Sequence, residues 1–114
     1  MESILTSIKK LLTINEDCLD FDTDIIMHIN TVFSGLKQMG AGPKEGFTIK
    51  DKYALWTDYI PKTNQNLEMI KTYVYLKVRL IFDPPTISSL LESLQKMVEE
   101  YEWRISVEVD AGGL

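Results

Sequence analysis

The sequence offers little support for disulfide bonds, a signal peptide or a membrane span. It holds one cysteine, Cys18, so no disulfide can form within the chain. A small domain without disulfides is typical of a reducing compartment. The apolar start at residues 1–12 is interrupted by Lys9 and Lys10, and no small-residue cleavage site follows, so we do not interpret it as a signal peptide. No run approaches the roughly 20 apolar residues of a membrane-spanning helix. We therefore expect a cytoplasmic protein that does not enter a membrane.

Positive charge is also scarce. The chain has 12 lysines and arginines against 17 aspartates and glutamates, a net charge of −5. The nearest approach to a basic patch is the scatter of Lys71, Lys77 and Arg79. Proteins that grip nucleic acid usually present a basic patch to the phosphates, so we expect no specific DNA binding. An acidic surface would instead let DNA pass nearby without sticking.

The sequence lacks a complete metal-binding motif. Asp20, Asp22 and Asp24 resemble the opening of a calcium-binding EF-hand loop. That motif needs glycine at its sixth position and glutamate at its twelfth, where this chain has Ile25 and Thr31. Acidic residues at the start of a helix are also favoured by the helix dipole. We therefore expect no calcium site here.

Catalytic signatures are missing too. His28 is the only histidine, and together with Cys18 it cannot supply the three or four ligands of a zinc site. The glycines of Gly40-Ala41-Gly42 precede Pro43 and follow a predicted helix, which indicates a helix stop and not a phosphate-binding loop. No nucleophile, base and acid form a recognisable constellation. We expect no enzyme activity, metal or cofactor.

The apolar pattern predicts one mainly α-helical domain spanning residues 1–114. Its length and its content of 45% hydrophobic and 25% charged residues suit an ordinary globular domain. Apolar residues at helical spacing predict a compact bundle of about four helices, at residues 3–12, 22–39, 66–82 and 86–106. We expect Asp22 to cap the second helix and Gly40 to end it. The third is apolar over most of its girth, so Val74 should lie at the centre of the bundle.

Two segments depart from the helical pattern. Phe47 and Ile49 alternate with polar residues before a turn at Asp51-Lys52, which predicts a small β-hairpin between helices two and three, with Trp56 in the core. A helical turn at residues 58–60 could follow it. Residues 103–109 also alternate, but the glutamates before them favour helix. We expect helix to about Ser106 and a flexible tail at about 107–114.

The residues that best fit an interface are one tryptophan and a group of acids. On an ideal helix Trp103 lies about 180° from Leu94, opposite the apolar face. An outward tryptophan suits an interface anchor, although it could also cap the bundle end or belong to a strand. The acidic candidates are Glu16, Asp17, Asp20, Asp22 and Asp24.

Several segments of the chain resemble a known family. They are ESILTSIKKLL, FDTDIIMHIN, GAGPKEGF, WTDYIP, KTYVYLKVRLIFDPP and EEYEWR. Together they resemble the phage head–tail connectors, or DNA-packaging adaptors, of tailed phages and prophages of Gram-positive bacteria. The likeness runs from Glu2 to about Arg104 and carries no catalytic residues.

This resemblance implies a helical subunit of the virion that is made in the host cytoplasm. Such subunits form a ring beneath the portal protein, extend the DNA channel and dock a tail-completion or stopper protein. A ring needs two different faces on each subunit, because head-to-tail contacts are heterologous. The acidic residues named above could line a channel that repels DNA or dock onto a basic portal surface.

A different class of function is compatible with the same residues. A small cytoplasmic helical regulator that binds another protein, such as an inhibitor, would also be acidic, compact and without a catalytic constellation. An enzyme with an unrecognised site is a weaker third alternative. A regulator should be a monomer or a closed dimer, whereas a connector should form higher rings, so the state of assembly separates these interpretations.

Overall fold

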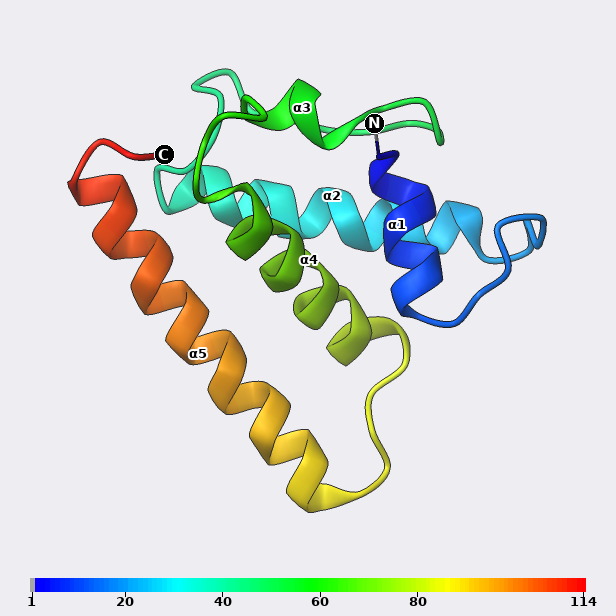
Figure 1. The fold of residues 1–114 in the computed structure, drawn as a ribbon. Helices are drawn as coiled ribbons and strands as arrows, with labels where there is room; N and C mark the ends of the chain where they lie inside the picture. The colour runs from blue at the N-terminus through cyan, green and yellow to red at the C-terminus, as the bar shows by residue number, and fades with distance from the viewer. Residues whose placement is uncertain (1) are drawn as a thin grey trace.

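The computed structural model describes residues 2–114, which fold into five α-helices. They are α1 (Ile4–Leu11), α2 (Asp22–Gln38), α3 (Trp56–Tyr59), α4 (Leu67–Phe82) and α5 (Ser88–Asp110). Figure 1 shows α4 in the middle, with α2 crossing it and α5 running beside it, while residues 39–66 with α3 cover the top. The predicted mainly α-helical bundle is confirmed.

The core lies where α4 meets its neighbours. Val74 is fully buried, as are Ile70 and Val78 on the same helix. From α2 come Ile25, Ile29, Phe33 and Leu36, all nearly or wholly inaccessible to solvent. The helical spacing of these residues is the pattern that marked them in the sequence, so the prediction that Val74 lies at the centre of the bundle is confirmed.

The start of α2 differs from the expectation. Phe21, not Asp22, occupies the N-cap position, and no side chain caps the helix. Asp22 is the first residue of the helix, and its carboxylate lies 2.8 Å from the ammonium group of Lys9. The prediction that Asp22 is the N-cap is therefore wrong, because its side chain pairs with Lys9. Phe21 packs edge-on against Phe82 with 5.6 Å between ring centroids.

The predicted β-hairpin at residues 47–56 is wrong. Between Glu2 and Leu114 there is no β-strand, only a single antiparallel bridge between Ser3 and Leu55. Each arm of the expected hairpin pairs elsewhere. The side-chain amide of Asn30 accepts a hydrogen bond from Ile49 N–H at 2.8 Å and donates one to Ile49 C=O at 2.9 Å. The other arm pairs with the start of the chain, since Ile4 N–H donates to Ala54 C=O at 2.9 Å.

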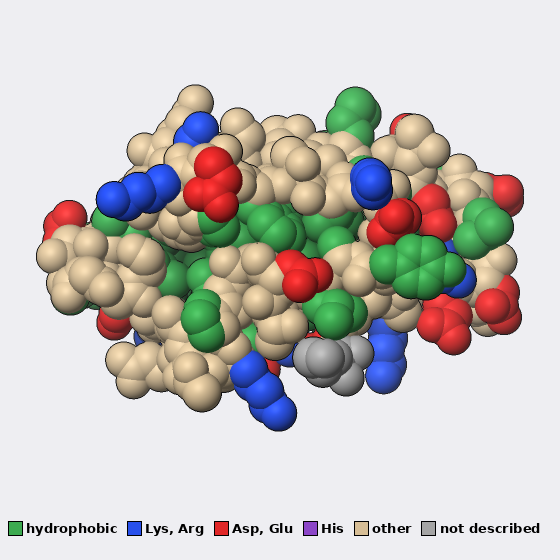
Figure 2. Space-filling view, turned by 90° about the horizontal axis from the view of Figure 1, so that it is seen from above, with side chains coloured by type: hydrophobic (Ala, Val, Ile, Leu, Met, Phe, Trp, Pro, Cys, Tyr) green, Lys and Arg blue, Asp and Glu red, His purple; other side chains and the backbone are tan. Residues whose placement is uncertain are grey.

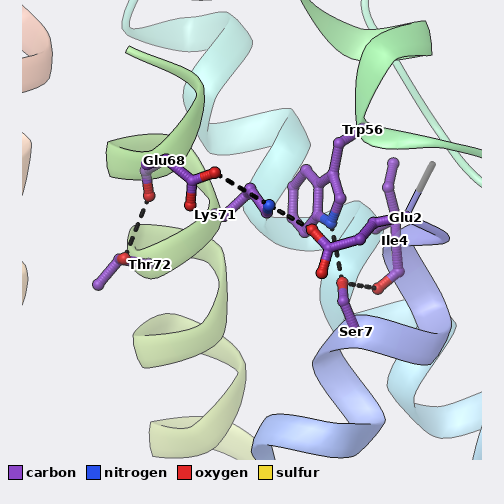
Figure 3. Close-up of polar contacts among 7 residues, drawn as sticks. All are labelled: Glu2, Ile4, Ser7, Trp56, Glu68, Lys71 and Thr72. Carbon is purple, nitrogen blue, oxygen red and sulfur yellow. Dashed lines mark hydrogen bonds and ion pairs between the residues drawn. The ribbon is translucent and has the colours of Figure 1, made fainter. Parts of the chain in front are cut away.

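The N-terminal segment is fastened to α3 and α4 by side chains (Figure 3). Trp56 is buried, as predicted, and its indole N–H donates to the Ser7 hydroxyl at 2.8 Å. The Lys71 ammonium on α4 forms ion pairs with Glu2 and with Glu68. The contacts of Trp56 with Ser7 and of Lys71 with Glu2 join segments some 50 to 70 residues apart in sequence. They hold the short helix α1 in place. A helix of eight residues would not be stable in an isolated peptide.

The last helix is longer than expected. It runs to Asp110, beyond the predicted end near Ser106. Ile105 is fully buried, so the alternation at 103–109 belongs to a helix that packs one side on the bundle. Beyond it, Gly113 C=O accepts a hydrogen bond from the Asn64 side-chain amide at 3.0 Å. The flexibility expected for the tail stays a prediction that amide hydrogen exchange would test.

Candidate interaction surfaces

Trp103 lies on the outer face of α5. The inner face of the helix is marked by the buried residues Leu94, Val98 and Ile105. Trp103 keeps 68% of its surface exposed, and Val107, one turn later, keeps 45%. Two neighbouring apolar side chains are therefore open to solvent on a helix whose opposite side already satisfies the core. We call Trp103 and Val107 the outer α5 pair.

The orientation of the outer α5 pair is fixed by contacts on the flanks of the helix. The Tyr73 hydroxyl on α4 donates a hydrogen bond to the Glu102 carboxylate at 2.8 Å. Burial, and then this carboxylate, raise the pKa of Tyr73 above its ordinary value. Further round the helix, Arg104 lies 3.4 Å from Glu100. Glu102 is thus held against α4, and Trp103, about 100° further round the helix, keeps most of its surface open to solvent.

The acidic residues lie in a loop held by a buried lysine. Lys9 is 2% exposed. Its ammonium group donates hydrogen bonds to Glu16 C=O at 3.0 Å and to Cys18 C=O at 2.7 Å, and it pairs with Asp22 at 2.8 Å. The Asp22 carboxylate neutralises the buried charge, and the two carbonyl contacts fix the backbone of the loop. We use the name acidic loop for residues 13–24, which are the connection between α1 and α2 and the first turn of α2, with Glu16, Asp17, Asp20, Asp22 and Asp24.

The acidic loop forms one end of the molecule. Figure 2 shows acidic side chains gathered at the right, the end at which Figure 1 places the connection between α1 and α2. Glu16, Asp17, Asp20 and Asp24 are exposed, while Asp22 is partly buried by its contact with Lys9. In Figure 1, α5 runs along the opposite side, with α4 between. The structure therefore does not bring the acidic candidates together with Trp103.

A groove between α2, α4 and α5 was not found by sequence reasoning. It has a volume of about 1000 Å³. Its walls include Ile26 and Met27 of α2, Met39 at the end of that helix, Tyr73, Lys77 and Ile81 of α4, and Glu102 of α5. Met27 is 57% exposed and Ile81 47%. The sequence signal was an exposed methionine off the apolar stripe of α2, but only the packing of three helices makes it part of a groove.

The described residues contain no cluster of side chains suited to bind a metal ion. Within residues 2–114, no three histidines, cysteines, aspartates or glutamates are placed to hold a metal ion. His28 packs near the Phe82 ring, with 6.3 Å between ring centroids. None of the helices described is both long and apolar enough to cross a membrane.

Comparison with known proteins adds one finding. A family model described as "Phage connector protein" matches residues 4–112. The match begins at the first residue of α1 and extends past the end of α5, so it includes all five helices. Among curated proteins and among solved structures, no match to the chain is found.

Proposed function

The chain belongs to the phage connector protein family, and from this premise we propose that it is a structural subunit of the head–tail connector. In this role, copies form a ring beneath the portal protein, extend the DNA channel and dock the tail through a tail-completion or stopper protein. The subunit is made in the host cytoplasm and ends in the virion. The role is mechanical and uses no catalytic residue.

The observation that carries this proposal is the family match over residues 4–112. Because the match includes every helix between Glu2 and Leu114, it covers the whole of the described fold, which supports a connector role for that fold. The net charge of −5 supports passage of DNA without specific binding.

The two predicted surfaces suit different partners within such an assembly. The outer α5 pair offers an apolar anchor for a neighbouring copy, since large exposed aromatic residues are typical of binding hot spots. The acidic loop suits a basic surface of the portal. Lining a channel requires charge but no fixed loop shape, whereas Lys9 holds the loop in one conformation. This buried clamp favours docking of the loop onto a partner.

Removing the gene from the phage that carries it tests the proposed function. We expect DNA-filled heads and separate tails, visible by negative-stain electron microscopy, and recovery of joined particles when the wild-type chain is supplied. A Trp103→Ala copy should restore joining poorly. Tyr53→Ala is the matched control, because Tyr53 is an equally exposed aromatic in a different segment and should restore it fully. Normal virions from the deletion would contradict the proposal.

A further inference from the structure

We propose that the outer α5 pair of one copy docks in the α2–α4–α5 groove of a second copy, so that copies join head to tail. The inference rests on the proposed function, because it names the two surfaces through which copies in the connector would meet. It goes beyond that function by pairing Trp103 with a receptor built from Met27, Lys77 and Ile81.

The groove has the chemistry to receive an aromatic side chain. Ile26, Met27, Met39 and Ile81 supply apolar surface from two helices. Methionine adapts its shape and makes favourable sulfur–aromatic contacts. With a volume of about 1000 Å³, the groove is large enough for the Trp103 side chain.

Charge favours a second copy as the occupant. Among the described residues that line the groove, the charged ones are Lys77 and Glu102, whose Nζ and Oε2 atoms lie 3.8 Å apart. In an acidic protein this groove is a surface without net charge, so another acidic copy can approach it. Because Lys77 is already paired with Glu102, the groove presents no excess of either charge to the acidic residues Glu99 and Glu100 that precede Trp103.

A contact between two acidic loops would place five carboxylates of one copy against five of the other. Like charges brought together at an interface oppose binding. Pairing the outer α5 surface with the neutral groove avoids this arrangement.

Trp103 does not fill the groove of its own chain. It follows Glu102, which lines the groove from α5, but it is not itself one of the lining residues and keeps 68% of its surface exposed. A contact between two different surfaces is heterologous, and it forms a ring when the rotation between copies closes.

Two complementary variants test the pairing. Trp103→Ala removes the inserted side chain but keeps the groove. Met27→Glu puts a carboxylate in the groove but keeps Trp103. Neither chain should associate with itself, whereas an equimolar mixture should form a one-to-one complex through its one intact pair of surfaces. Tyr53→Glu is the charge-matched control, because it also replaces an exposed apolar residue by glutamate and should associate like the wild type.

Nuclear magnetic resonance of ¹⁵N-labelled Trp103→Ala chain detects even weak contact, with Kd on the order of 1 mM. We expect amide shifts at Met27, Lys77 and Ile81 when unlabelled Met27→Glu chain is added, and none when unlabelled Trp103→Ala chain is added. Circular dichroism of each variant checks that it folds. The inference is overturned by absence of shifts, by shifts confined to the acidic loop or α5, or by loss of association in Tyr53→Glu.

The result is independent of the test of the proposed function. If deletion of the gene leaves virions intact, the connector role fails whatever the mixture does. If deletion separates heads from tails but the mixture shows no groove shifts, the connector role stands and the copies meet through other surfaces.

Discussion

Lys9 is the residue whose local role departs most from its ordinary behaviour. Lysines usually lie at the surface, but this one is 2% exposed and reaches two carbonyl oxygens and one carboxylate of the acidic loop. The sequence placed Lys9 only as an interruption of an apolar segment. Its role depends on a loop that returns to α1, and a pattern confined to one helix does not contain that information.

Replacing Lys9 by methionine tests this clamp. Lys9→Met keeps most of the side-chain volume but leaves the Asp22 carboxylate and two loop carbonyls without their partner. We expect the free energy of unfolding to fall by about 3 kcal/mol, the size typical of breaking a buried ion pair. Urea denaturation followed by circular dichroism measures it. The exposed neighbour is the control, and Lys10→Met should change stability by less than about 0.5 kcal/mol.

Because of two buried tyrosines, we expect the folding stability of the chain to decrease at alkaline pH. Burial raises the pKa of Tyr59 to about 12, and burial with the Glu102 carboxylate raises that of Tyr73. Because the pKa of each tyrosine is higher in the folded chain than in the unfolded chain, its protonated hydroxyl contributes to folding stability. That contribution is complete below about pH 10 and is lost as the pH rises through the pKa of the folded chain.

The melting temperature should therefore fall steeply above about pH 10. For Tyr59 the full loss is about 2 to 3 kcal/mol, since one pKa unit corresponds to about 1.4 kcal/mol. In the Tyr59→Phe variant, the melting temperature should decrease less steeply with rising pH. Stability at neutral pH should not decrease, because among residues 2–114 the Tyr59 hydroxyl has no hydrogen-bond partner. An equally steep fall in Tyr59→Phe would contradict this assignment.

At the scale of elements, helices with a repeated apolar pattern were predictable and segments held by distant side chains were not. Apolar residues at helical spacing, among them Ile25 and Leu36, marked α2, and apolar residues over most of the girth of the helix, Val74 among them, marked α4. The alternation at Phe47 and Ile49 predicted a strand. That segment instead takes its hydrogen bonds from Asn30, which lies 19 residues earlier.

Asn30→Ala tests this replacement of a hairpin by a side-chain clamp. The substitution leaves the N–H and C=O of the buried Ile49 without partners, which should cost about 1 to 3 kcal/mol. Hydrogen exchange of the Ile49 amide should accelerate along with the loss of stability. Thr31→Ala removes only a local bond to Met27 C=O on the exposed side of α2 and should have little effect. Unchanged exchange at Ile49 in Asn30→Ala would show that the clamp does not hold the segment.

The end of α5 shows the same limit. The alternation of Trp103, Ile105, Val107 and Val109 matched strand periodicity, and the predicted helix ended near Ser106. The helix continues to Asp110, and Asn66 donates a hydrogen bond to Glu108 at 3.1 Å. Asn66 belongs to the start of α4, so the contact becomes visible only when both helices are packed. Helical spacing nevertheless placed Trp103 correctly on the side away from Leu94.

For the whole molecule, substitutions of the two tryptophans should distinguish an effect on folding from an effect on assembly. Trp56 is buried and bonded to Ser7, so Trp56→Ala should cost more than about 3 kcal/mol of folding stability. Trp103 is mostly exposed, so Trp103→Ala should leave monomer stability within about 0.5 kcal/mol while weakening assembly by about 2 kcal/mol or more. Circular dichroism and sedimentation on the same samples measure both. A melted Trp103→Ala chain would show that Trp103 serves the fold.

The interaction surfaces were only partly predictable because they belong to the assembled molecule. Charge marked the acidic loop, and helical spacing marked Trp103. Each of these features lies within one continuous segment of the chain, so the sequence contains the information that identifies it. The α2–α4–α5 groove depends on how three helices pack, so its residues are separated by up to about 80 positions in the chain. The resemblance of the whole sequence to phage connectors, together with the family match, is what links these surfaces to a role.

Cryo-electron microscopy of the head–tail junction, in the phage that carries this chain, tests the central claim most directly. The account predicts a ring of copies between the portal and the tail, with Trp103 of each copy in the groove formed by α2, α4 and α5 of the next. A junction that contains no copies of this chain would contradict the connector role. A ring whose copies leave Trp103 open to solvent would contradict the contact proposed between them.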